Sequence, residues 1–214
     1  MRRFLFCCRF LTLAVTVIML GGCINLGLGK GTTKSTKFYV LHALDSPEAE
    51  RKADIPGAGV IGVGPVTLPQ YLNRPQLMIR VSQNEYQVAP FAQWAEPLRD
   101  NFIGVLADNL SVLLETDKIA VFPWKTYTPI DYKVEVDVIR FDGEKGGDVR
   151  LHARWIIFGK DGKTLLRIRK SSFSAPADAG NYGAMVSAMS QTLADLSREI
   201  ADSIKDLSQE KTSE

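Results

Sequence analysis

The chain has 214 residues, of which 45% are hydrophobic, 9% aromatic and 23% charged, a composition that excludes a disordered, collagenous or disulfide-dense protein. Lys and Arg number 26 against 24 for Asp and Glu, and three of the arginines lie in the first ten residues. Without those three, 23 basic residues face 24 acidic ones, which disfavours a basic surface for binding nucleic acid.

The first 22 residues have the pattern of a secretory signal. Three arginines precede an uncharged, mostly apolar run over residues 10–20, which is about half of the roughly 20 residues needed to span a bilayer. Residues 20–23 (LGGC) follow and resemble the bacterial lipobox, whose cysteine receives a diacylglyceryl group. The sequence therefore predicts a lipoprotein signal over 1–22 and lipidation of Cys23. An ordinary signal peptide or a short uncleaved anchor is the alternative.

Cleavage before Cys23 would leave one cysteine in the mature chain, so no disulfide would be possible. Several acyl chains on that residue, palmitate among them, would anchor it stably, because each buried CH₂ group contributes about 0.8 kcal/mol. An Asp after the cysteine resembles an inner-membrane retention signal in lipoproteins of enterobacterial type. This chain has Ile24 there, which favours the outer membrane with the protein facing the periplasm. Residues 23–36 are rich in Gly, Thr and Lys and predict a flexible tether.

The folded domain is expected over 37–207, with a polar tail over 208–214. Its first part reads as four strands, at 38–41, 59–68, 77–81 and 85–88, the last two joined by a hairpin at Ser82-Gln83-Asn84. An apolar period of 3.6 then predicts an amphipathic helix over about 97–116, with Pro97 in its first turn. A short strand is expected at 119–122.

The second part predicts three strands with alternating side chains, at 132–138, 149–157 and 165–173, followed by a helix over about 182–207. Asp161-Gly162 suits a tight turn between the last two strands. The expected fold is a single α/β domain, with a mixed β-sheet, an antiparallel C-terminal meander and two main amphipathic helices packed on the sheet. On the polar face, Glu135 and Asp137 are expected beside four arginines, either as a solvated ion-pair ladder or as a docking face. These arginines are Arg150, Arg154, Arg167 and Arg169.

Catalytic signatures are not found in the sequence. Its two histidines, His42 and His152, have no metal-ligand spacing, and there is no G-x-S-x-G nucleophile motif. The glycines at 62 and 64 are followed by Pro65 and more strand, where a phosphate loop would begin a helix. The sequence therefore predicts no enzyme, no catalytic residues, no metal and no cofactor.

The most distinctive segment is 62–76 (GVGPVTLPQYLNRPQ), followed downstream by WAEPL at 94–98. Together with the lipobox, it resembles the ABC-type transport auxiliary lipoprotein family, the PqiC-like lipoproteins that accompany membrane-spanning MCE-domain proteins. The resemblance runs from about Phe38 to the last helix. Asn73 departs from the Asp associated with that position, so an ion pair between that residue and Arg74 is in doubt.

The resemblance implies an outer-membrane lipoprotein that scaffolds an MCE-type system for lipid transport between membranes and for envelope integrity. The implied partners are an MCE-domain protein, the membrane through the lipid anchor and, as a possibility, further copies of this chain. Two rivals remain: a stand-alone periplasmic lipid- or ligand-binding lipoprotein, and an assembly lipoprotein of another envelope machine.

Tyr71, Leu72 and Arg74 are the candidate partner-binding residues, because an aromatic, an apolar side chain and a guanidinium on a proline-stiffened loop match interface composition. In the alternative, Tyr71 and Leu72 fill the edge of the core and Arg74 pairs locally with Glu96. Trp94 is expected in the core.

Overall fold

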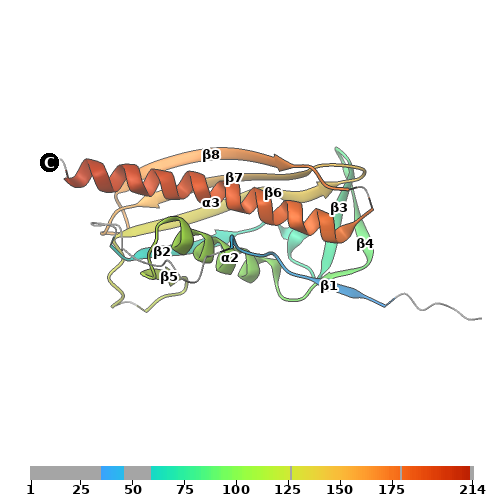
Figure 1. The fold of residues 1–214 in the computed structure, drawn as a ribbon, viewed down its shortest axis with the longest axis horizontal. Helices are drawn as coiled ribbons and strands as arrows, with labels where there is room; N and C mark the ends of the chain where they lie inside the picture. The colour runs from blue at the N-terminus through green and yellow to red at the C-terminus, as the bar shows by residue number, and fades with distance from the viewer. Residues whose placement is uncertain (1–34, 46–58, 126, 179, 213–214) are drawn as a thin grey trace, which may run out of the picture. The chain divides into compact units, whose positions relative to one another are not determined.

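The computed structural model describes residues 35–45, 59–125, 127–178 and 180–212, which belong to one compact unit. Cys23 and most of the predicted tether lie outside these residues. The described part is a mixed α/β domain with one eight-stranded sheet, as the sequence predicts (Figure 1). The strands are β1 (Lys37–Tyr39), β2 (Ile61–Thr67), β3 (Gln76–Ser82), β4 (Glu85–Trp94), β5 (Ile119–Val121), β6 (Tyr132–Glu144), β7 (Val149–Phe158) and β8 (Leu165–Ala175).

The long strand β6 organises the sheet. One of its edges pairs with β7 in antiparallel register, and β7 continues to β8, which gives the predicted C-terminal meander. The other edge pairs first with β2 and then with β3, both parallel. The strand β2 continues to β5, and β3 to β4 and β1. The nearly continuous apolar sequence of β2 fits this central position between two neighbours.

Two helices, α2 (Leu98–Leu113) and α3 (Tyr182–Thr212), cover one face of the sheet. The helix α2 packs on β2 and β5, α3 packs on the meander, and the helices contact each other (Figure 1). Fully buried aromatic rings fill the space between the layers: Trp155 lies on β7, and Phe102 of α2 meets Phe141 of β6 edge to face at 5.4 Å. Within the described residues, no helix is both long and apolar enough to cross a membrane.

The segment after β1 crosses both helices and is held by their polar side chains. The Leu41 amide donates to Asn101 Oδ1 and the Leu44 amide to Asn109 Oδ1, both on α2. Asn109 is fully buried and donates in turn to Ser197 of α3 at 3.1 Å. Buried amides of this kind satisfy backbone groups that would otherwise lose hydrogen bonds on folding.

Several elements are longer than the sequence predicts. The strand β4 continues through Trp94, across an irregularity in its pairing with β3. The strand β6 continues past Val138 to Glu144, across a bulge at 138–140. The helix α3 continues past Leu207 to Thr212, with Ser208 buried and bonded to the carbonyl of Ile204.

The predicted polar face is wrong for two of its arginines. Arg150 and Arg154 do lie on the face away from the helices, but Arg167 and Arg169 pair with Ile157 and Trp155 and share their inward face. On the strand β8, at the end of the meander, the side chains of Arg167 and Arg169 extend to carboxylates of α3. Arg169 lies 3.5 Å from Glu199, and Arg167 lies 3.9 Å from Glu210. Long basic side chains can occupy such a position because their charged ends reach the edge.

Candidate interaction site at the double-proline turn

The double-proline turn, which we define as residues 69–75, connects β2 to β3. It contains a single 3₁₀ turn, η1 (Gln70–Leu72), in which the Leu72 amide donates to the Pro69 carbonyl at 2.9 Å. The Pro75 carbonyl accepts a 2.7 Å hydrogen bond from the amide of Trp94, which fixes the end of the turn to β4. Since proline restricts φ at both ends, the turn has little conformational freedom to lose on binding.

Gly62 and Gly64 in β2 let side chains from the segment after β5 pack closely against this strand. A Cβ on Gly62 would lie about 3 Å from the rings and methyl groups of Trp124 and Ile130. Gly64 has φ +115°, and a Cβ there would lie 2.7 Å from the Cβ of Phe122. These glycines are explained by close packing and, at Gly64, by a left-handed backbone.

Tyr71 joins the turn to a buried carboxylate on β6. Its hydroxyl donates to Asp142 Oδ2 at 2.9 Å, and its ring stacks on Tyr86 of β4 at a centroid distance of 4.6 Å. The Tyr86 hydroxyl donates to the same oxygen at 3.0 Å. Tyr71 is half-buried, so it holds the turn on the sheet and keeps part of its surface exposed.

Asp142 is 1% exposed and is balanced by two arginines. Arg140 Nε donates to its Oδ1 at 2.9 Å, and Arg80 Nε lies 3.5 Å from the same atom. Arg80 also donates to the Tyr86 hydroxyl and stacks over the Tyr86 ring at 4.4 Å. A buried charge needs such pairing, because burying an unpaired carboxylate costs several kcal/mol.

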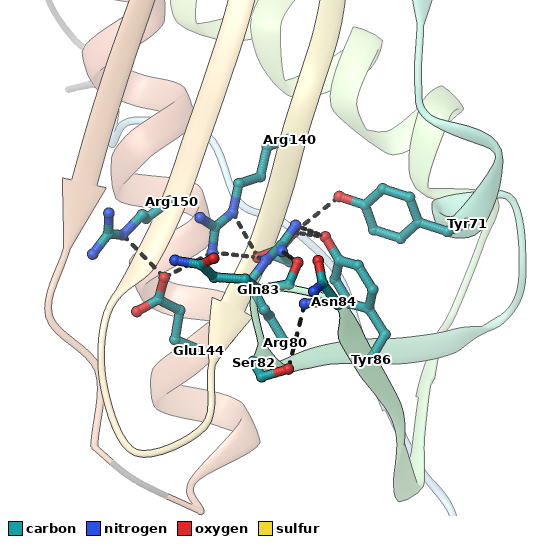
Figure 2. Close-up of polar contacts among 10 residues, drawn as sticks. Tyr71, Arg80, Ser82, Gln83, Asn84, Tyr86, Arg140, Glu144 and Arg150 are labelled. Carbon is teal, nitrogen blue, oxygen red and sulfur yellow. Dashed lines mark hydrogen bonds and ion pairs between the residues drawn. The ribbon is translucent and has the colours of Figure 1, made fainter.

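Figure 2 shows these polar contacts, with Tyr71 and Tyr86 on one side and Arg150 on the other. Glu144 extends the network, since it accepts from Arg140 Nη2 at 2.9 Å and lies 3.2 Å from Arg150 Nε. We use the name Asp142 cluster for Tyr71, Arg80, Tyr86, Arg140, Asp142, Glu144 and Arg150.

The surroundings shift the pKa of four groups in this cluster. Burial, the hydrogen bond with Tyr86 and the negative charge of Asp142 raise the pKa of Tyr71, so its hydroxyl remains a donor. Burial also raises the pKa of Tyr86. Burial lowers the pKa of Arg140, but hydrogen bonds to Asp142 and Glu144 outweigh it and the net pKa is raised. The hydrogen bond from Arg140 lowers the pKa of Glu144. These shifts favour an anchor whose protonation state is constant near neutral pH.

The turn and the start of α2 enclose a groove of about 740 Å³. Leu72, one of the candidate residues, is 4% exposed and packs into the core beneath it. Arg74 is exposed on one wall and Glu96 is on another, and among the described residues no ion pair joins them. Trp94 is 6% exposed, in the core as the sequence predicts. The full lining is Val66, Thr67, Leu68, Gln70, Leu72, Asn73, Arg74, Pro75, Trp94, Ala95, Glu96, Pro97, Leu98 and Arg99.

The structure thus places the three candidate residues differently. Tyr71 bonds the turn to Asp142, Leu72 is buried beneath the turn, and Arg74 is an exposed residue of the groove lining. Sequence reasoning missed Asp142, Arg80 and Tyr86, which fix this geometry from other strands. In the described ranges, no group of three or more His, Cys, Asp or Glu residues could hold a metal ion.

Solved crystal structures share this fold, including the following two. Protein XCC0632 from Xanthomonas campestris has a TM-score of 0.63 and 17% identity, over 83% of this chain and 99% of its own. An uncharacterized protein has a TM-score of 0.59 and 22% identity, over 80% of this chain and 99% of its own. None of the curated proteins compared with the sequence matches it.

A family model also matches the sequence, over residues 39–201. The match runs from β1 to α3 and includes the double-proline turn, the groove and the Asp142 cluster. The sequence predicts the same family from the lipobox, from residues 62–76 around this turn and from residues 94–98. The chain belongs to the family of ABC-type transport auxiliary lipoprotein components.

Proposed function

We propose that this chain is the outer-membrane lipoprotein subunit of an MCE-type ABC lipid transport system. In this proposal, acylated Cys23 holds the domain at the membrane and the tether over 23–36 lets it face the periplasm. The groove beside the double-proline turn receives the end of the periplasm-spanning MCE-domain protein. The domain acts as a scaffold for lipid transport between the membranes and carries out no chemistry itself.

The observation that carries the proposal is that the groove combines apolar and charged lining residues on an anchored turn. Its walls combine apolar surface from Leu68, Pro75 and Pro97 with the charges of Arg74 and Glu96. The turn that forms one wall is rigid and anchored through Tyr71 on Asp142. A preformed surface with apolar and charged groups suits protein recognition, because little ordering entropy is lost on binding.

The family supplies the second support, since an auxiliary component of an ABC-type transporter acts beside other subunits. The rival function, a stand-alone lipid- or ligand-binding module, requires an enclosed apolar pocket. The groove has charged residues on its walls, including Arg74, Glu96 and Arg99, and this favours the docking function.

The test is chemical cross-linking of the anchored protein in its native envelope, followed by mass spectrometry of the attached chains. Recovery of an MCE-domain protein would support the proposal. Recovery of self-links alone, with lipid co-purifying, would contradict it and favour the binding module. A variant with Cys23→Ala serves as control, because an unanchored chain should lose the same cross-link.

A further inference from the structure

The face of the meander that points away from the helices has a cluster of basic side chains at its centre. Three neighbouring rows cross β6, β7 and β8 there, with Asp142, Arg150 and Ser174 in the first. The second row contains Arg140, His152 and Ser172, and the third contains Asp137, Arg154 and Lys170. We name as the basic face Arg140, Arg150, His152, Arg154 and Lys170.

Carboxylates neutralise only part of this charge. Together with Arg80 and Glu144 at the rim, five permanently basic groups face three carboxylates: Asp137, Asp142 and Glu144. Asp142 and Glu144 are already shared among Arg80, Arg140 and Arg150. Arg154 lies 3.8 Å from Asp137, and more than half of each side chain is exposed. Ion pairs this exposed hold the two groups together weakly, so Arg154 is available to another anion.

His152 lies in the middle of the basic face, between Arg140 and Ser172 in the second row. Burial lowers the pKa of His152, and the positive charges of Arg140, Arg150 and Lys170 lower it further against an opposing effect of Asp142. His152 is only part-buried, and the neighbouring Ser172, Ser174 and Lys170 are exposed. An anion placed over His152 would therefore meet a positive potential and open access from solvent.

The spacing of the basic face suits a phosphate group. Side chains on the same face of a strand repeat at about 6.5 Å and opposite residues on neighbouring strands lie about 5 Å apart, so the long side chains of Arg154 and Lys170 can converge over His152. Figure 2 shows the terminal nitrogens of Arg150 pointing away from Glu144. Guanidinium groups bind phosphate oxygens in pairs, and serine hydroxyls supply further donors.

Beyond the third row, the same face carries two isoleucines beside Glu135, a carboxylate that pairs with Lys133 at 2.8 Å. Ile156 and Ile168 pair with each other next to Arg154 and Lys170, and Ile168 is 52% exposed. A ligand over both regions would combine an anionic group with a hydrocarbon part, as a phospholipid does.

We propose that the basic face binds a phosphate group, such as the headgroup phosphate of an anionic phospholipid. This site is separate from the groove and lies on the opposite face of β7 from α3. It goes beyond the proposed docking of a protein partner, and its failure would leave that docking function untouched.

The chain's two histidines allow a direct test by NMR. The mature protein in a non-ionic detergent is titrated with inorganic phosphate, with chloride and glutamate at equal ionic strength as controls, and the His152 and His42 imidazole signals are assigned from His→Gln variants. Phosphate should shift the His152 signal saturably and raise its apparent pKa by about half a unit or more, as a bound anion stabilises imidazolium. His42 should not respond.

A double variant, Arg154→Gln with Lys170→Gln, should weaken the phosphate response about tenfold. Both residues are exposed, so the fold should be unaffected. The matched control, Lys160→Gln with Lys163→Gln at the exposed turn between β7 and β8, should bind as the unchanged protein does. Dihexanoyl phosphatidylglycerol below its micelle concentration replaces phosphate in a second arm. A stronger response than to phosphate assigns the site to lipid headgroups, and a weaker one assigns it to free phosphate.

Two results would overturn the proposal. The first is a His152 response to chloride or glutamate equal to that with phosphate, which would show general ionic screening or recognition of carboxylates. The second is an unchanged phosphate response in the double variant at positions 154 and 170.

Discussion

Tyr71 and Asp142 are 71 residues apart in sequence, and a 2.9 Å hydrogen bond joins them. Through this bond the double-proline turn rests on the buried charge of β6. The same carboxylate accepts from Tyr86 and Arg140, so one side chain connects the turn, the β3–β4 hairpin and the meander. Arg74 lies three residues after Tyr71 in the same turn and lines the groove.

Tyr71→Phe is expected to destabilise the domain by about 1.5–3 kcal/mol, the usual value of a hydrogen bond to a charged group. Asp142→Ala should cost more, about 3–5 kcal/mol, because it leaves Arg80 and Arg140 without their shared carboxylate. The free energy of unfolding in urea measures both. Tyr127→Phe is the control, since Tyr127 is 77% exposed and its change should stay within about 0.5 kcal/mol. Equal effects for Tyr71→Phe and Tyr127→Phe would contradict the anchoring role.

Gly64→Ala should destabilise the domain by about 2 kcal/mol or more, because a methyl group there meets Phe122 in addition to the strained φ of +115°. Gly146→Ala separates the two causes. Gly146 has φ +89° with open space around its Cβ position, so this variant should cost only about 1 kcal/mol. Thermal or urea unfolding compares the two, and a Gly146→Ala effect as large as that of Gly64→Ala would show that contact with Phe122 is unimportant.

Stability should depend on pH through Glu144, whose pKa is lowered in the folded chain by the hydrogen bond from Arg140. Because the pKa of Glu144 is lower in the folded chain than in the unfolded chain, the ionised side chain stabilises the fold at pH values above the unfolded pKa. This stabilisation is lost as the pH falls through the folded-state pKa. Glu144→Gln should therefore reduce the free energy of unfolding at pH 7, by about 1 kcal/mol or less because the side chain is one-third exposed. The difference between the two proteins should shrink below about pH 4.5. A difference that is constant down to pH 2.5 would contradict this cause.

Arg74→Glu should weaken binding of the MCE-domain partner about tenfold while leaving the free energy of unfolding within about 0.5 kcal/mol, because Arg74 is exposed. Binding of the purified proteins and urea unfolding provide the two readings. Lys160→Glu introduces the same charge change at a turn outside the groove and should leave binding unchanged. Loss of stability in Arg74→Glu would instead indicate a structural role for the arginine.

Cys23→Ala should release the protein from the membrane fraction and abolish its labelling with palmitate. The released domain should unfold at the same urea concentration as the anchored form, since the buried core of the described residues is formed by positions 41–207. Retention of the variant in the membrane would contradict lipidation at this residue.

Periodic patterns predicted most of the fold correctly because β6, β7 and α3 each place apolar residues at the period of their element. The extension of β6 could not be predicted in the same way. Its bulge at 138–140 shifts the alternation, and Asp142-Gly143 resembles a turn. In β8 the pattern was misleading, since the apolar Ile168 faces outward and Arg169 faces α3. The residues of β8 that face the helices are those that alternate in step with Phe173, which pairs with the buried Leu151.

The sequence predicts only the part of the candidate site that lies in one continuous segment. The turn residues stand out because they are consecutive and include two prolines. The groups that hold them lie on β3, β4 and β6, and only the folded sheet brings Arg80, Tyr86 and Asp142 together. No local pattern identifies a carboxylate whose partners come from three strands.

The most direct test of the docking function is photo-cross-linking from the groove itself. A photoreactive amino acid replaces Asn73, an exposed residue that lines the groove, in the anchored protein in its native envelope, with Lys160 as the matched position outside it. The account predicts an MCE-domain protein cross-linked from position 73 and absent from position 160. The same cross-link from both positions, or none from position 73 while position 160 yields one, would contradict docking at the double-proline turn.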